Sequence, residues 1–86
     1  MEYEWDALKS AANITAGRPG FGDIEGFEWE SAVIKGSDRH GEERWAAIGY
    51  LGSRLHHVVY TERGDNRRII SLRRASTREE REYAEA

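Results

Sequence analysis

The chain has 86 residues, a formal net charge of −3 and no cysteine, so it is expected to form one small domain over residues 1–86. The lack of cysteine excludes a disulfide framework and a thiolate metal site. No apolar run approaches the roughly 20 residues of a membrane span, and the N-terminus has no positive signal-peptide head, so we expect a cytoplasmic protein without a membrane partner.

The first expected elements are a short strand and a capped helix. Residues 3–5 have a composition that fits a short edge strand. Asp6 is a favourable N-cap for a helix over residues 7–14, and Gly17 is expected to end that helix.

Less regular patterns follow in the middle of the chain. Residues 21–26 are compatible with one helical turn. Phe27 and Trp29 alternate with two glutamates before an apolar run, which predicts a strand around residues 28–35. A polar loop is expected over residues 36–41.

The second half of the chain predicts three consecutive strands and a helix. Residues 44–50 and 55–60 are rich in strand formers, and the polar segment 62–66 is a turn that returns the chain through residues 67–74. Ser76 and Glu79 form a capping box for a charged helix from Thr77 to about Glu85.

These elements predict an α+β fold. Consecutive strands joined by short turns form an antiparallel meander, so we expect a small antiparallel sheet of three meander strands plus one or two further strands. The N-terminal and C-terminal helices are expected to cover one face of this sheet.

Strand alternation assigns side chains to the two faces of that sheet. In the last strand, Ile70 and Leu72 belong to the set with the larger apolar load and are expected to face the core together with Arg68 and Arg74. Arg73 would then point to the opposite face, beside Ser71 and together with Arg67 and Ile69.

The neighbouring histidines His56 and His57 must also point to opposite sides of the sheet. Histidine titrates near neutrality and is the default acid–base candidate, although a lone histidine in an apolar strand is more often structural. The structural role is favoured for His57, and His56 is retained as a catalytic candidate.

Short motifs in a fixed order extend nearly from end to end of the chain. They are Glu4-Trp5-Asp6 with Lys9 and Asn13, Asp38-x-x-Gly41-Glu42-x-Arg44, Arg54-Leu55-His56, residues 59–65, residues 68–75, and Arg78-Glu79 with Tyr83. In order and spacing they resemble the BrnT toxins of type II toxin–antitoxin modules.

The resemblance implies a RelE-like α+β fold and a ribonuclease that slows translation, without a cofactor. It also implies a cognate BrnA-type antitoxin as partner, with DNA bound only indirectly through that antitoxin. Where the family usually has a Lys-His-Gly step, this chain has Ala16-Gly17-Arg18. Either that basic pair is not catalytic, or this chain is weakened, or Arg18 replaces it.

RNA is cut without metal when its 2′-hydroxyl attacks the adjacent phosphate, which requires a proton acceptor and cations. An arginine fork suits the cationic role, and eleven of the thirteen basic residues are arginine, a bias that a G+C-rich genome would also produce. The catalytic candidates are Arg44, Arg73 and His56, and the RNA-binding candidates are Arg39, Arg63 and Tyr83. No metal-ligand spacing is present.

Simpler roles remain open for several of these residues. Arg73 would instead pair with Glu79 or Glu80 at the surface, and Tyr83 would instead anchor the last helix. Two other functions also compete with the ribonuclease: a module that only binds the antitoxin and co-represses, and a plain nucleic-acid-binding domain. The acidic N-terminal half argues against the second of these.

Overall fold

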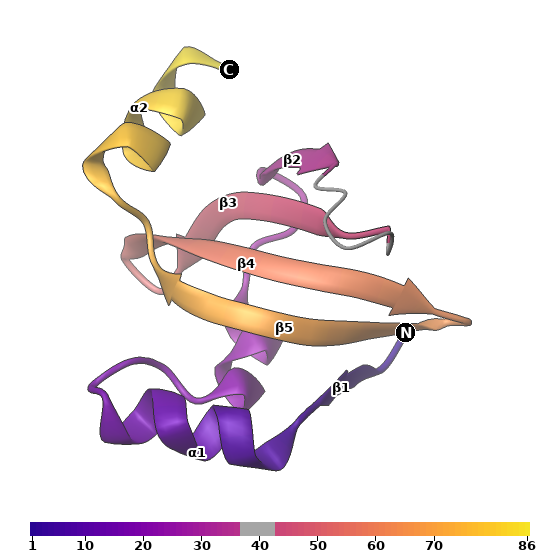
Figure 1. Cartoon of the computed structure of the whole chain (residues 1–86). Coiled ribbons are helices and arrows are strands. Elements are labelled where there is room, and N and C mark those ends of the chain that lie inside the picture. The colour runs from indigo at the N-terminus through magenta and orange to yellow at the C-terminus, as the bar shows by residue number, and fades with distance from the viewer. Residues whose placement is uncertain (37–42) are drawn as a thin grey trace.

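The computed structural model describes residues 1–36 and 43–86. Their elements follow the order expected from the sequence (Figure 1). These are β1 (Tyr3–Trp5), α1 (Ala7–Thr15), the 3-10 helix η1 (Phe21–Gly26), β2 (Val33–Gly36), β3 (Trp45–Leu51), β4 (Arg54–Arg63), β5 (Asn66–Arg74) and α2 (Thr77–Glu85).

Five strands form one sheet in the order β1-β5-β4-β3-β2. The strands from β2 to β5 are antiparallel, whereas β1 pairs in parallel with β5 and makes the sheet mixed. The α+β class and the meander are therefore confirmed. Gly64 adopts a φ of 58° in the turn between β4 and β5, a backbone angle that glycine reaches without strain.

The core lies on one face of the sheet, beneath η1. Phe21, Ile24 and Phe27 pack there against inward residues of β3, β4 and β5. Each of these three side chains is buried. Burying an aromatic or aliphatic side chain of this size contributes roughly 1.5–3 kcal/mol, so η1 is a principal source of stability.

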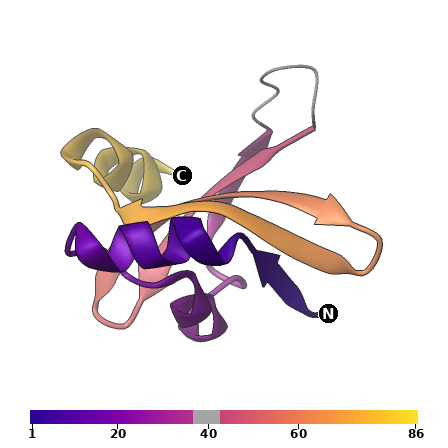
Figure 2. The ribbon, with the colours of Figure 1, turned by 60° about the horizontal axis from the view of Figure 1, so that its bottom comes forward.

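The helices lie on both faces of the sheet, which corrects the expectation of a single covered face (Figures 1 and 2). Helix α1 lies beside η1, on the core side. Helix α2 contacts β3 from the opposite side, where the Tyr83 ring packs edge-to-face on Tyr50 with 5.7 Å between centroids. The side of the sheet that α2 borders is called the open face below.

The predicted strand around residues 28–35 is too long at its start. Phe27 makes only an isolated bridge to Leu51, and β2 begins at Val33. A turn intervenes, in which the Ala32 amide donates to the Trp29 carbonyl at 3.1 Å. The rings of Phe27 and Trp29 pack against each other with 4.7 Å between their centroids, but neither residue belongs to a strand.

A β-bulge changes which residues of β5 face the core. Val59 pairs with Ser71 but Tyr60 pairs with Ile69, so Ile70 is an extra residue on β5. Ile69 and Leu72 are consequently both buried, although they are three positions apart. The prediction was right for Leu72 and wrong for Ile69 and Ile70.

Helix α2 is attached to the sheet by few contacts and has no buried residue. Its start has the predicted capping box, in which the Ser76 amide donates to Glu79 at 2.8 Å and the Glu79 amide donates to Ser76 at 3.2 Å. An ion pair between Lys35 and Glu82 at 3.2 Å adds an exposed contact. None of the helices in the described ranges has the length and apolarity to span a membrane.

Candidate active site on the open face

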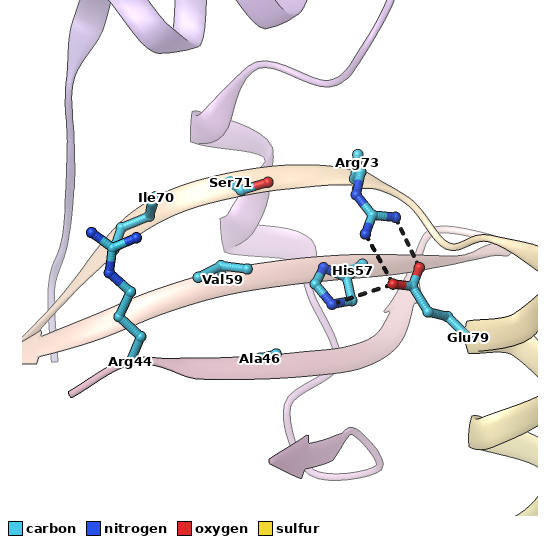
Figure 3. Close-up of a pocket in the computed structure, with 8 residues that line it drawn as sticks. All are labelled: Arg44, Ala46, His57, Val59, Ile70, Ser71, Arg73 and Glu79. Carbon is cyan, nitrogen blue, oxygen red and sulfur yellow. Dashed lines mark hydrogen bonds and ion pairs between the residues drawn. The ribbon is translucent and has the colours of Figure 1, made fainter. Parts of the chain in front are cut away.

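A hollow of about 410 Å³ lies on the open face, across β3, β4 and β5 (Figure 3). Its size is within the roughly 300–1,000 Å³ of small-molecule sites. It is lined by Arg44, Ala46, His57, Val59, Ile70, Ser71, Arg73 and Glu79. The bulge contributes directly to this lining, because it brings Ile70 and Ser71 side by side onto the open face.

At one end of the hollow, Arg73 and Glu79 form a bidentate ion pair. The two terminal nitrogens of Arg73 donate to the two carboxylate oxygens of Glu79 at 2.8 and 2.9 Å. The Glu79 side chain is only 16% exposed, and the capping box fixes its backbone. These bonds lower the pKa of Glu79 to about 2, chiefly through Arg73, so the carboxylate is ionised at neutral pH.

The third member of this cluster is His57, whose position follows from strand register. His57 pairs directly with Arg73 across β4 and β5, so both side chains point to the open face. The His57 Nε2 atom lies 3.4 Å from Glu79 Oε2, and the ring is 15% exposed. Burial lowers the pKa of His57 despite the nearby carboxylate, so the imidazole is neutral at pH 7.

Arg44 lines the other end of the same hollow. It immediately precedes β3, and its side chain extends toward Ile70 in Figure 3. Since Trp45 pairs with Tyr60, Arg44 lies about four positions along β4 from His57, or roughly 13 Å at the strand rise. The hollow therefore has an arginine at each end and small or apolar side chains between them.

The remaining predicted site residues lie elsewhere. His56 is buried on the core side of the sheet, and its Nδ1 donates to the Arg54 carbonyl at 2.9 Å. Arg63 is at the tip of the β4–β5 hairpin, roughly 20 Å of strand from His57. The ring of Tyr83 packs on Tyr50, which supports the anchor role. Arg39 falls outside the described residues.

Of the predicted catalytic set, the open face thus unites Arg44 and Arg73 and leaves out His56. The sequence favoured a structural role for His57 and gave Glu79 only as an ion-pair partner of Arg73, and the structure places both beside Arg73 in the hollow. The turn alone would place His57 opposite Leu72, and the extra residue at the bulge shifts its partner to Arg73, so no local signal in the sequence identified this contact. In residues 1–36 and 43–86, the structure has no cluster of three histidine or acidic side chains that would hold a metal ion.

The fold and this site define a small α+β protein with arginines and a neutral histidine gathered on one exposed sheet face. The model of one protein family, described as "Ribonuclease toxin, BrnT, of type II toxin-antitoxin system", matches residues 5–79. The chain therefore belongs to the BrnT family of ribonuclease toxins, whose type II systems pair each toxin with an antitoxin protein. No curated protein matches the chain.

Proposed function

We propose that this protein is an endoribonuclease that cleaves RNA in the hollow of the open face by attack of a 2′-hydroxyl on the adjacent phosphate. The new bond joins the 2′-oxygen to phosphorus, and the bond from phosphorus to the 5′-oxygen breaks. The leaving 5′-oxygen takes up a proton from solvent, so the products are a 2′,3′-cyclic phosphate and a 5′-hydroxyl. The observation that carries this proposal is the gathering of Arg44, His57 and Arg73 around one hollow.

The arginines supply the charge that such a reaction needs. The Arg73 fork already holds two oxygens of a planar anion, which is the geometry with which arginine binds phosphate. Arg44, at the other end of the hollow, is suited to a neighbouring phosphate of the same strand. Removing a donor that stabilises developing charge typically costs a factor of 10²–10³ in rate.

His57 is the proposed proton acceptor. A neutral imidazole takes up a proton readily near pH 7, and burial keeps His57 in this form. Its Nε2 faces the hollow beside Arg73, whereas its Nδ1 is buried without a hydrogen-bond partner among the described residues. Nε2 is therefore the ring nitrogen that can reach a 2′-hydroxyl once Glu79 has left, and it accepts that proton when the proton of the neutral ring is on Nδ1.

Glu79 must leave this position before RNA can react. Its carboxylate occupies both the Arg73 fork and the space beside His57 Nε2, so it competes with the phosphate. Helix α2, which carries Glu79, has no buried residue and is held by ion pairs and one aromatic contact. Such an attachment opens at low cost. We propose that RNA binding displaces α2 from this end of the hollow.

The same site accounts for toxicity and its neutralisation. Cutting RNA in the cell would inhibit translation, and a cognate BrnA-type antitoxin would prevent it by covering the open face. The partly exposed arginines of that face are suited to an acidic segment, since Arg73 already binds the Glu79 carboxylate.

The test is incubation of the purified chain with total RNA in the presence of EDTA, alongside Arg73→Ala and the control variant Lys9→Ala. The wild-type chain and the control should cleave, and Arg73→Ala should cleave at least a hundredfold more slowly. Intact RNA at micromolar wild-type protein, with no growth arrest on expression, would overturn the proposal.

The occupied Arg73 fork also favours a second candidate, a toxin homologue that no longer cleaves and serves as an antitoxin-binding co-repressor. In that case expression of the chain alone is harmless, and Arg73→Ala changes only the affinity for the antitoxin. Toxicity that disappears with Arg73→Ala, while the antitoxin complex still forms, excludes this candidate.

A further inference from the structure

A second hollow, of about 520 Å³, lies at the other side of the sheet, where the loop after α1 meets the end of β5. Its lining consists of Gly17, Arg18, Pro19, Asp23, His56, Arg73 and Arg74. It is separate from the open-face hollow, but Arg73 borders both. The two hollows therefore meet at the end of β5.

Asn13 fixes the geometry of this second hollow. Its side-chain amide donates to the Leu72 carbonyl at 2.6 Å and to the Pro19 carbonyl at 3.0 Å. These two bonds tie the loop to β5 two residues before Arg74. Gly17, with a φ of 79°, lets the chain turn there at no steric cost. Arg18 is consequently held close to Arg74.

The charges in this hollow favour an anionic ligand. Arg18 and Arg74 are both exposed, and neither guanidinium has an ion-pair or hydrogen-bond partner in the part of the chain that the structure describes. The single acid of the lining is Asp23. His56 donates its Nδ1 proton to the Arg54 carbonyl. The lining has three arginines against one carboxylate, and even with Arg73 paired to Glu79 its charge balance is positive.

We propose that this second hollow binds a phosphate of the RNA substrate, next to the phosphates held on the open face. Arg73 and Arg74 are consecutive in β5 and point to opposite faces, so an RNA strand gripped by both passes around the end of the sheet. Arginine forks also bind carboxylates, but continuity with the open-face hollow favours the substrate strand over an acidic segment of the antitoxin. This inference rests on the proposed ribonuclease function.

The experiment compares the double variant Arg18→Ala/Arg74→Ala with a charge-matched control, Lys9→Ala/Arg81→Ala. Cleavage is measured on a dinucleotide, which fills the open-face hollow alone, and on an oligonucleotide of about ten residues. The double variant should raise KM for the longer substrate about tenfold, leave its kcat unchanged and leave dinucleotide cleavage unchanged. The control should alter none of these values.

A binding measurement keeps this inference testable apart from catalysis. The affinity of wild type and both variants for a 2′-O-methyl oligonucleotide, which cannot be cleaved, is followed by fluorescence anisotropy over a series of salt concentrations. The double variant should lower the slope of log K against log salt by roughly 1–2. The second phosphate site would be overturned by an unchanged salt slope or by an equal loss of cleavage on the dinucleotide and the longer substrate. It would also be overturned if the double variant lost affinity only for the antitoxin. If neither the wild type nor any variant cleaves RNA, the ribonuclease proposal fails. The anisotropy measurement then decides by itself whether the second hollow binds a phosphate.

Discussion

Arg73 and Glu79 are joined by two parallel hydrogen bonds of 2.8 and 2.9 Å, and they come from different elements, β5 and α2. The pair does two things at once. It fastens the C-terminal helix to the sheet, and it fills the arginine fork with a carboxylate in the place where we expect a phosphate. Stability of α2 and access to the site are therefore coupled.

Neutralising Glu79 should increase ribonuclease activity. In Glu79→Gln the amide keeps the shape of the side chain but no longer offers two anionic oxygens to Arg73, so RNA displaces it more easily. We expect kcat/KM to rise several-fold, with faster hydrogen exchange in residues 77–85. Glu80→Gln, on the same helix but without this ion pair, is the matched control. A loss of activity as large as that of Arg73→Ala would mean that Glu79 positions the catalytic groups instead of competing with RNA.

Substitution of His57 should affect catalysis, whereas substitution of His56 should affect stability. His57→Gln should reduce kcat at least a hundredfold with little change in thermal stability, because the ring faces the open hollow. His56→Gln should lower the melting temperature, because His56 is 6% exposed and donates to the Arg54 carbonyl. The wild-type rate should fall as pH drops through the lowered pKa of His57, below 6.5. Equal kinetic losses for both variants would contradict this assignment.

Acid should release α2 before it unfolds the sheet. The folded pKa of Glu79 is about 2, against an ordinary value of 4.5, so its stabilising effect is complete above pH 4.5 and is lost as pH falls toward 2. Because the Arg73 side chain is 37% exposed, we expect a contribution on the order of 2 kcal/mol. Carbon-13 NMR of the Glu79 carboxyl should give a midpoint near 2. A midpoint near 4.5 would show that the ion pair does not persist in solution.

Glycine at position 49 is required by close packing. A methyl group there would lie 2.8 Å from Phe27 Cζ and 3.1 Å from Ala32 Cβ, with the Glu28 carbonyl oxygen at 3.3 Å. Gly49→Ala should therefore destabilise the protein by about 1–3 kcal/mol in chemical denaturation. Gly36→Ala is the control, because its nearest neighbour, Trp45 Cζ3, is at an ordinary 3.7 Å. Equal stability of the two variants would contradict the packing of Phe27 against β3.

Local signals in the sequence predicted most of the elements. The Asp6 cap and the Ser76–Glu79 capping box both form as expected, because these motifs depend on residues a few positions apart. The parallel pairing of β1 with β5 joins Tyr3 to Arg67 and has no local signature. The mixed character of the sheet was accordingly not predicted.

Along β5, alternation predicted the faces correctly after the bulge and incorrectly before it. His56 and His57 do point to opposite sides, and Arg73 does lie beside Ser71 on the open face. The extra residue Ile70 reverses the pattern for Ile69. Placing His57 instead of His56 on the open face required knowing which face is covered by η1, and that depends on packing between segments far apart in the chain.

The central claim is that the open face catalyses 2′-hydroxyl attack on RNA, and the chemistry of the product ends tests it most directly. A DNA oligonucleotide with a single ribonucleotide is incubated with the purified chain in EDTA, and the products are analysed by mass spectrometry. We predict cleavage only after the ribonucleotide, leaving a 2′,3′-cyclic phosphate and a 5′-hydroxyl. Cleavage that leaves a 3′-hydroxyl and a 5′-phosphate, or that requires added divalent metal, would contradict the account.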